Sequence, residues 1–283
     1  MKLRTAVLAL CVVALAAAPL EAQAPVTLKT TELGQGPTVV LVPGLGGARM
    51  QWLPTARKLM GGHRVVMVDL PGHGDSPMPD PFSLENAAAA LDRVLERQKA
   101  ESTIVVGHGL GGILAVLAAR KAPERVRGVA VIDAGLKTPF SNIPDQQRKY
   151  FLDYINASQQ NYDAFLKQMF SSLGRDSAQG VEIHSRAVLV PATSIRAYFR
   201  ELLYMDYSEA AKQLKVPLLY VGSSRAWADT ASWATVARER GLDGAPHVTA
   251  KRVPNSGYLI MSDQPDSLAA AIADFARRVL AAK

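Results

Sequence analysis

The chain has 283 residues, of which 48% are hydrophobic and 20% are charged. This composition excludes a disordered chain and suits a single domain with a large core. The formal charge of +7 is scattered, and its longest basic groups are pairs such as Lys251 and Arg252. We therefore expect no nucleic-acid partner.

Residues 1–24 have the pattern of an export signal. Lys2 and Arg4 precede an apolar run over residues 6–18, and small residues follow it. The run is short for a membrane span, so we expect a signal peptide over 1–24 and a secreted or periplasmic protein without stable membrane insertion after cleavage. An uncleaved anchor helix is the alternative. Cys11 is the only cysteine, so the mature chain would contain no thiol or disulfide.

The rest of the chain, residues 25–283, alternates between strand and helix patterns. This alternation predicts an α/β fold with a mostly parallel central sheet flanked by helices. Strands are expected near 26–32, 38–43, 64–70, 102–107, 126–132, 216–222 and 247–253, and helices near 48–60, 83–99, 110–121, 229–241 and 265–281. Residues 137–213 interrupt the alternation and predict a helical insertion. Their aromatic residues have helical spacing, so we expect most of them to pack in the core of that insertion.

Three glycine-rich turns follow the expected strands in the first half of the chain. Residues 43–47 (Pro-Gly-Leu-Gly-Gly) follow the second strand, and residues 69–76 (Asp-Leu-Pro-Gly-His-Gly-Asp-Ser) follow the third. Residues 104–112 (Ile-Val-Val-Gly-His-Gly-Leu-Gly-Gly) combine a strand, a sharp turn and the start of a helix. This is the pattern of a nucleophile elbow, in which the apex residue projects out of the sheet. Gly109 stands at that apex.

Two later segments complete the pattern: the strand over residues 217–222, and residues 253–258 followed by Asp-Gln-Pro. In their order and spacing the five segments resemble the α/β-hydrolase superfamily, of the AB hydrolase-1 type. The resemblance implies the α/β-hydrolase fold with a helical cap inserted at about residues 137–213. It also places Gly109, Arg225 and Tyr258 where relatives carry the catalytic serine, acid and histidine, so the triad is degenerate.

These replacements remove the chemistry of serine hydrolysis. Glycine has no nucleophile, arginine cannot accept a hydrogen bond, and tyrosine is a poor base near neutral pH. The resemblance still places an oxyanion hole at the backbone N–H groups of Leu45 and Leu110, at the start of a helix. We expect the missing serine side chain to leave room there. Arg225 would add positive charge if it faces the pocket, and its direction stays open.

Other polar residues are weaker candidates. Asp133 follows the strand over 126–132, a position from which some relatives supply an alternative acid; without a histidine we expect it to cap the next turn. We expect His108 to be packed and hydrogen-bonded, and His73 to be a surface or loop residue. The remaining histidines lack zinc-ligand spacing, so we expect no metal site and no cofactor.

The chain is therefore predicted to be a secreted pseudo-hydrolase. It would bind a small anionic or carbonyl-containing ligand, such as a carboxylate or an ester, without serine hydrolysis; a protein partner stays open. The alternative is an active hydrolase, lyase or isomerase of the same superfamily. In that enzyme the oxyanion hole would polarise a carbonyl, and Tyr258 or Asp133 would move a proton.

Overall fold

A computed structural model describes residues 26–281 of the protein. The expected export signal lies outside the described residues. Within them, one sheet contains seven strands in the order β1-β3-β2-β4-β5-β6-β7. The strands are β1 (Thr30–Leu33), β2 (Thr38–Val42), β3 (Arg64–Val68), β4 (Thr103–His108), β5 (Gly128–Ile132), β6 (Leu218–Ser223) and β7 (Val248–Val253).

The sheet is mostly parallel. Only β1 runs antiparallel, paired with β3 at one edge, while in the centre Val105 of β4 pairs with Val40 of β2 and Val129 of β5. Every residue of β2, β4 and β5 is buried. Such uninterrupted apolar strands require cover on both faces. The prediction of an α/β fold with a mostly parallel central sheet is confirmed.

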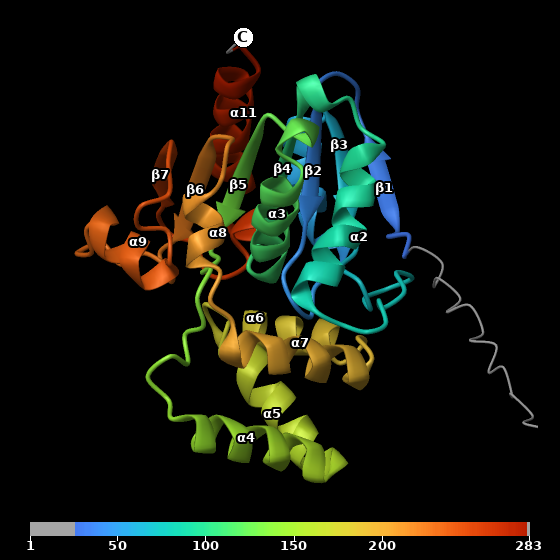
Figure 1. Ribbon diagram of the computed structural model, residues 1–283, viewed down its shortest axis with the longest axis vertical. Helices are drawn as coiled ribbons and strands as arrows, with labels where there is room; N and C mark the ends of the chain where they lie inside the picture. Colours follow the sequence, from blue (N-terminus) through green and yellow to red (C-terminus); the bar gives the residue numbers. More distant parts are fainter. Residues whose placement is uncertain (1–25, 282–283) are drawn as a thin grey trace, which may run out of the picture.

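Helices cover both faces of the sheet (Figure 1). On one face α2 contacts α3, and on the other α1 contacts α11. The helices of the sheet domain are α1 (Leu53–Leu59), α2 (Leu84–Glu96), α3 (Leu110–Lys121), α8 (Ser208–Lys212), α9 (Trp233–Arg240), α10 (Ile260–Asp263) and α11 (Pro265–Ala281). Short 3-10 helices span η1 (Arg49–Trp52), η2 (Ala100–Ser102) and η3 (Pro123–Arg125). No helix among residues 26–281 combines the length and apolar character needed to span a membrane.

Two expected helices differ in their bounds. The segment 48–60 divides into a 3-10 turn and α1, with a proline in the first turn of α1, because Pro54 has no N–H to continue a preceding helix. The helix expected from residue 229 begins at Trp233 instead. The Ser232 side chain accepts a hydrogen bond from the Thr235 N–H and so caps it there.

The cap consists of α4 (Asp145–Ala157), α5 (Gln159–Ser171), α6 (Ser177–Ala187) and α7 (Ala192–Tyr204). In Figure 1 these helices lie below the sheet. The predicted helical insertion is confirmed, although α8, which we expected within it, contacts α3 of the sheet domain. Phe165 and Phe199 are buried with their rings 4.7 Å apart, so aromatic packing forms the core of the cap.

Candidate functional site

A cavity of about 540 Å³ lies between the sheet domain and the cap. Its sheet side is formed by loops that follow β2, β4, β5, β6 and β7, because the carboxyl ends of parallel strands meet at one edge of a sheet. Gly109, Arg225 and Tyr258, expected at the triad positions, all line this cavity, as do Leu45, Leu110 and Asp133. Apolar residues contributed by the cap include Met169, Phe170, Leu173, Phe199 and Leu202.

The nucleophile elbow is present in its backbone. Gly109 lies between β4 and α3 with φ of 49° and ψ of −120°, a conformation that side chains rarely adopt and that the sharp turn requires. The Gly109 N–H donates to the Ile132 carbonyl, 2.9 Å away, which holds the turn against β5. The apex therefore has the geometry of a nucleophile position without the nucleophile.

The space beside Gly109 is filled by Tyr258. A Cβ atom built on Gly109 would lie 2.7 Å from the Tyr258 hydroxyl oxygen, and one built on Gly44 would lie 2.6 Å from it. The hydroxyl thus lies between the loop after β2 and the elbow, where two glycines make room for it. Our expectation that the missing serine leaves room is wrong, because a residue far along the chain occupies that volume.

Tyr258 is suited to donate a proton or a hydrogen bond rather than to accept a proton. Burial raises the pKa of its phenol well above the usual value, and the nearby charge of Asp133 acts in the same direction. The hydroxyl therefore stays protonated at neutral pH. The alternative prediction that Tyr258 moves a proton is therefore compatible with Tyr258 acting as an acid.

Asp133 is held by the end of β6. Its carboxylate accepts hydrogen bonds from the backbone N–H of Ser223, at 2.6 Å, and from the Ser223 hydroxyl. Our expectation that it caps the following turn is wrong, because the strand order brings β6 next to β5. Burial raises the pKa of Asp133 to about 6, although Ser223, Arg240 and Arg225 act in the opposite direction. This value suits a group that exchanges protons near neutral pH.

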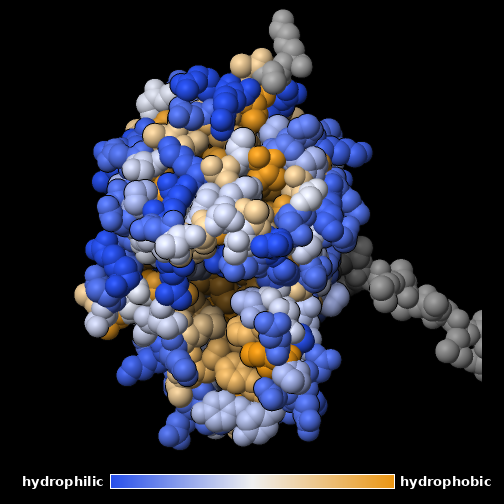
Figure 2. Space-filling model, turned by 90° about the vertical axis from the view of Figure 1, so that its left-hand side faces the viewer, coloured by the Kyte–Doolittle hydropathy of each residue, from blue (hydrophilic) through white to orange (hydrophobic). Residues whose placement is uncertain are grey.

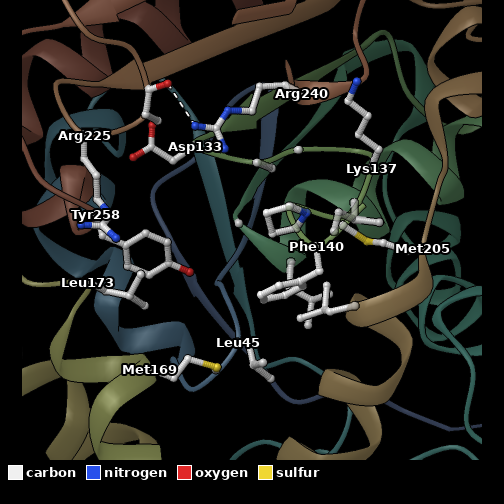
Figure 3. Close-up of a pocket in the computed structure, with 18 of the residues that line it drawn as sticks. Leu45, Asp133, Lys137, Phe140, Met169, Leu173, Met205, Arg225, Arg240 and Tyr258 are labelled. Atoms are coloured by element: carbon white, nitrogen blue, oxygen red, sulfur yellow. Dashed lines mark hydrogen bonds between the residues drawn. The ribbon is translucent and has the colours of Figure 1, made fainter. Parts of the chain in front are cut away.

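Three cationic residues line the same cavity: Arg225, Arg240 and Lys137. Arg225 is exposed, and within the described chain its guanidinium makes no hydrogen bond and no ion pair within 4 Å. Figure 3 shows Arg225 beside Tyr258. Its positive charge opposes in part the rise in the pKa of Tyr258 that burial causes. Arg240 donates to the Ala226 carbonyl at 3.1 Å. Sequence reasoning missed Arg240 and Lys137, since neither belongs to a motif.

His73 holds the loop that follows β2. Its Nε2 atom accepts a hydrogen bond from the Gly46 N–H at 3.1 Å, and Nδ1 lies 3.1 Å from the Pro71 carbonyl, to which it donates. Both bonds require a neutral ring, and burial lowers the pKa of His73 to about 4. His73 lies in the loop between β3 and α2, as expected, but it is fully buried and so not a surface residue. The neighbouring Leu45 and, at the start of α3, Leu110 make no N–H hydrogen bond to any described residue.

His108 is packed but not hydrogen-bonded. Its ring centroid lies 4.3 Å from that of Tyr258, and neither ring nitrogen has a hydrogen-bond partner among the described residues. Burial lowers its pKa to about 4, with the backbone of Tyr258 close enough to oppose this shift in part. The expected packing is present and the expected hydrogen bond is absent. We therefore assign His108 no proton-transfer role.

Behind Tyr258, Asp263 joins the cap to the sheet domain. Its carboxylate accepts hydrogen bonds from Arg175 at 2.9 Å and Gln179 at 2.8 Å, both in the cap, and from the Gly257 N–H at 2.7 Å. The Asp263 side chain is only 3% exposed. One carboxylate thus fixes both the cap and the residue that precedes Tyr258.

We expect Asp263→Ala to lower the free energy of unfolding by about 2–3 kcal/mol, because the buried donors of Gln179 and Gly257 would lose their acceptor. Asp274→Ala is the matched control, since Asp274 pairs with Arg277 on the surface of α11 and should change stability by less than about 0.5 kcal/mol. Urea denaturation of both variants measures the difference. Equal effects would show that the three contacts do not stabilise the fold.

Residues 26–281 contain no cluster of three or more His, Cys, Asp or Glu side chains that would hold a metal ion. Residues 39–271 match the family described as "Alpha/beta hydrolase family". The chain belongs to this family. The match spans most of the sheet domain, the whole cap and the positions of Gly109, Arg225 and Tyr258.

Relatives of this chain include a methyl ester esterase and a protein of biotin biosynthesis. The pimeloyl (acyl-carrier protein) methyl ester esterase of Pseudoalteromonas atlantica is 28% identical over 198 residues, which cover 69% of each chain. The biotin biosynthesis bifunctional protein BioHC of Cellvibrio japonicus is 30% identical, over 84% of this chain and 47% of its own length. Each of these names describes the relative and not this chain.

Solved structures share the fold. A thermophilic esterase from Thermogutta terrifontis superposes with a TM-score of 0.72 at 20% identity, covering 90% of this chain and 94% of its own. A bromoperoxidase from Bacillus anthracis gives a TM-score of 0.74 at 16% identity, covering 90% and 97%. At these identities the likeness concerns the fold alone.

Proposed function

We propose that this member of the alpha/beta hydrolase family is a binding protein. It would take a small anionic or carbonyl-containing ligand in the cavity beneath the cap, without serine hydrolysis. The observation that carries the proposal is the Tyr258 hydroxyl in the space that a side chain at Gly109 would need. A nucleophile cannot act from a position that another residue occupies. The proposal includes export through residues 1–24.

The electrostatic part of an acyl-transfer site supports ligand binding. The free N–H groups of Leu45 and Leu110 and the start of α3 favour negative charge or a carbonyl oxygen. Arg225 adds a cation that makes no hydrogen bond and no ion pair within the described chain. These groups would hold an anion or a carbonyl in place, because none of them needs a catalytic serine.

The proposal predicts that the purified protein does not turn over p-nitrophenyl esters of short and medium acyl chains above the buffer rate. Incubation with a fluorophosphonate, which labels activated serines, should leave the mass of the protein unchanged. The other measurement is a shift in melting temperature with a panel of carboxylates and esters. Clear ester turnover together with covalent labelling would overturn the proposal.

A second candidate function rests on Asp133. A buried carboxylate with a pKa of about 6 lines the cavity, and its charge acts on the protonated Tyr258. A carboxylate base and a phenol acid at one site would support a lyase or isomerase reaction on a carbonyl compound. Any activity found without serine labelling, and lost in both Asp133→Asn and Tyr258→Phe, would favour this enzyme.

A further inference from the structure

The cavity has two chemically different sides. In Figure 3, Arg225, Arg240, Asp133 and the ring of Tyr258 lie toward one side, while Met169, Leu45, Phe140 and Met205 lie toward the other. Figure 2 shows apolar side chains in a hollow between the cap and the sheet domain. At about 540 Å³ the cavity falls within the range of sites for small organic molecules. A ligand that fills it meets polar groups at one end and apolar surface along the rest.

The polar end favours an anion. Three cations, Arg225, Arg240 and Lys137, line the cavity against two carboxylates, Asp133 and Glu239. Two hydrogen bonds donated by Ser223 already stabilise the negative charge of Asp133. The Arg225 guanidinium is not committed to any carboxylate within the described chain, so a ligand carboxylate would gain a charge-assisted hydrogen bond there.

The apolar side favours a chain or ring rather than a compact anion. It includes Met169 and Phe170 of α5, Leu173 just after α5, and Phe199 and Leu202 of α7. Burial of an alkyl chain against these residues would contribute affinity with each methylene. A small inorganic anion would leave this surface empty.

From these two sides we infer that the cavity binds an amphiphilic monocarboxylate of the fatty-acid type, with its carboxylate at Arg225 and its alkyl chain beneath the cap. This inference rests on the proposed function, because an active hydrolase would release such an acid as product rather than hold it. The ligand class is defined by one negative charge and one apolar chain.

The test is isothermal titration of the protein with octanoate, decanoate and dodecanoate, each below its micelle concentration. The matched alcohols and methyl esters serve as neutral ligands. We expect the acids to bind at least about tenfold more tightly than the alcohols, because a charge-assisted bond is lost in the alcohols. Affinity for the acids should rise roughly three- to fourfold per added methylene until the cavity is full.

Variants separate the two ends of the site. Arg225→Gln should weaken the binding of the acids about tenfold and leave the binding of the alcohols unchanged. Asp133→Asn should strengthen the binding of the acids. Arg238→Gln, an exposed position on α9 outside the cavity lining, is the matched control and should change neither. Met169→Gln, at a half-buried position, should weaken the longer acids more than octanoate.

Equal binding of acids and alcohols, or no effect of Arg225→Gln in a folded variant, would overturn the inference. Binding that does not depend on chain length would also overturn it. Methanol release from the methyl esters is measured in the same samples. Release would refute the proposed function itself, whereas its absence together with equal binding of alcohols would refute only the ligand class.

Discussion

Gly109→Ser combined with Tyr258→His should create ester hydrolysis, whereas Gly109→Ser alone should not. In the single variant the new Cβ would lie 2.7 Å from the Tyr258 hydroxyl at a φ of 49°, so we expect a loss of about 1–3 kcal/mol in stability and no activity. The shorter imidazole at residue 258 removes the clash and supplies a base. Asp133, whose charge reaches residue 258, would orient it.

The double variant should hydrolyse p-nitrophenyl acetate at least about a hundredfold faster than Gly109→Ser, which is the lower end of the range for a positioned general base. The matched control is Gly109→Ala with Tyr258→His, which has the same backbone strain but no hydroxyl, and it should be inactive. Adding Arg225→Asp to the double variant restores an acid at the position where relatives carry it. We expect this change to raise the rate of ester hydrolysis by less than about tenfold, since Asp133 already supplies a carboxylate. Activity of the single variant equal to that of the double would contradict the role of Tyr258.

Acidification should destabilise the protein between about pH 6.5 and pH 4. The pKa values of His73 and His108 fall from 6.5 to about 4 in the folded chain. In this window the unfolded chain binds more protons, so stability falls as pH falls and levels off below about pH 4. Each histidine accounts for roughly 3 kcal/mol at most, from its shift of about 2.5 units.

Asp133 acts in the opposite direction. Its pKa rises from 3.8 to about 6 on folding, so the folded chain binds more protons between these values, and this contribution to stability grows as pH falls. When the contribution of Asp133 is subtracted from those of the two histidines, the free energy of unfolding falls by about 3 kcal/mol from pH 7 to pH 4. Urea denaturation at four pH values measures it.

Variants assign these contributions. Asp133→Asn removes the opposing group and should roughly double the acid-induced loss, whereas Asp274→Asn on the surface should not change it. His108→Phe should flatten the profile without removing a hydrogen bond, because its ring nitrogens have no partner among the described residues. His73→Phe should also cost stability at pH 7, since the Gly46 N–H would lose its acceptor. Parallel pH profiles for Asp133→Asn and the native protein would refute this account.

Local patterns were enough to predict most of the fold. Apolar strands and the glycine turns that end them depend on neighbouring residues, so most strand positions and the start of α3 at Leu110 followed from the sequence. The first strand was expected near residue 26, but β1 begins at Thr30. The errors in the bounds of α1 and α9 have local causes at Pro54 and Ser232, which outweighed helix propensity. The place of α8 was missed because it depends on packing against α3.

The site was predictable only as a set of positions. Register with the family pattern identified Gly109, Arg225 and Tyr258 as replacements for the triad, and all three line one cavity. The contents of that cavity were not predictable. Arg240 and Lys137 belong to no motif, and the Ser223 contacts of Asp133 depend on the pairing of β5 with β6.

By itself the sequence determined which chemical groups the protein has at its elbow: no serine at residue 109, no histidine at residue 258 and no acid at residue 225. Covalent structure settles such absences, because no fold adds a nucleophile to glycine. Only the tertiary structure decided that the Tyr258 hydroxyl fills the space beside Gly109 and Gly44 and that His73 is buried against Gly46. Side-chain direction and burial arise from contacts between residues far apart in the chain, and local sequence does not encode them.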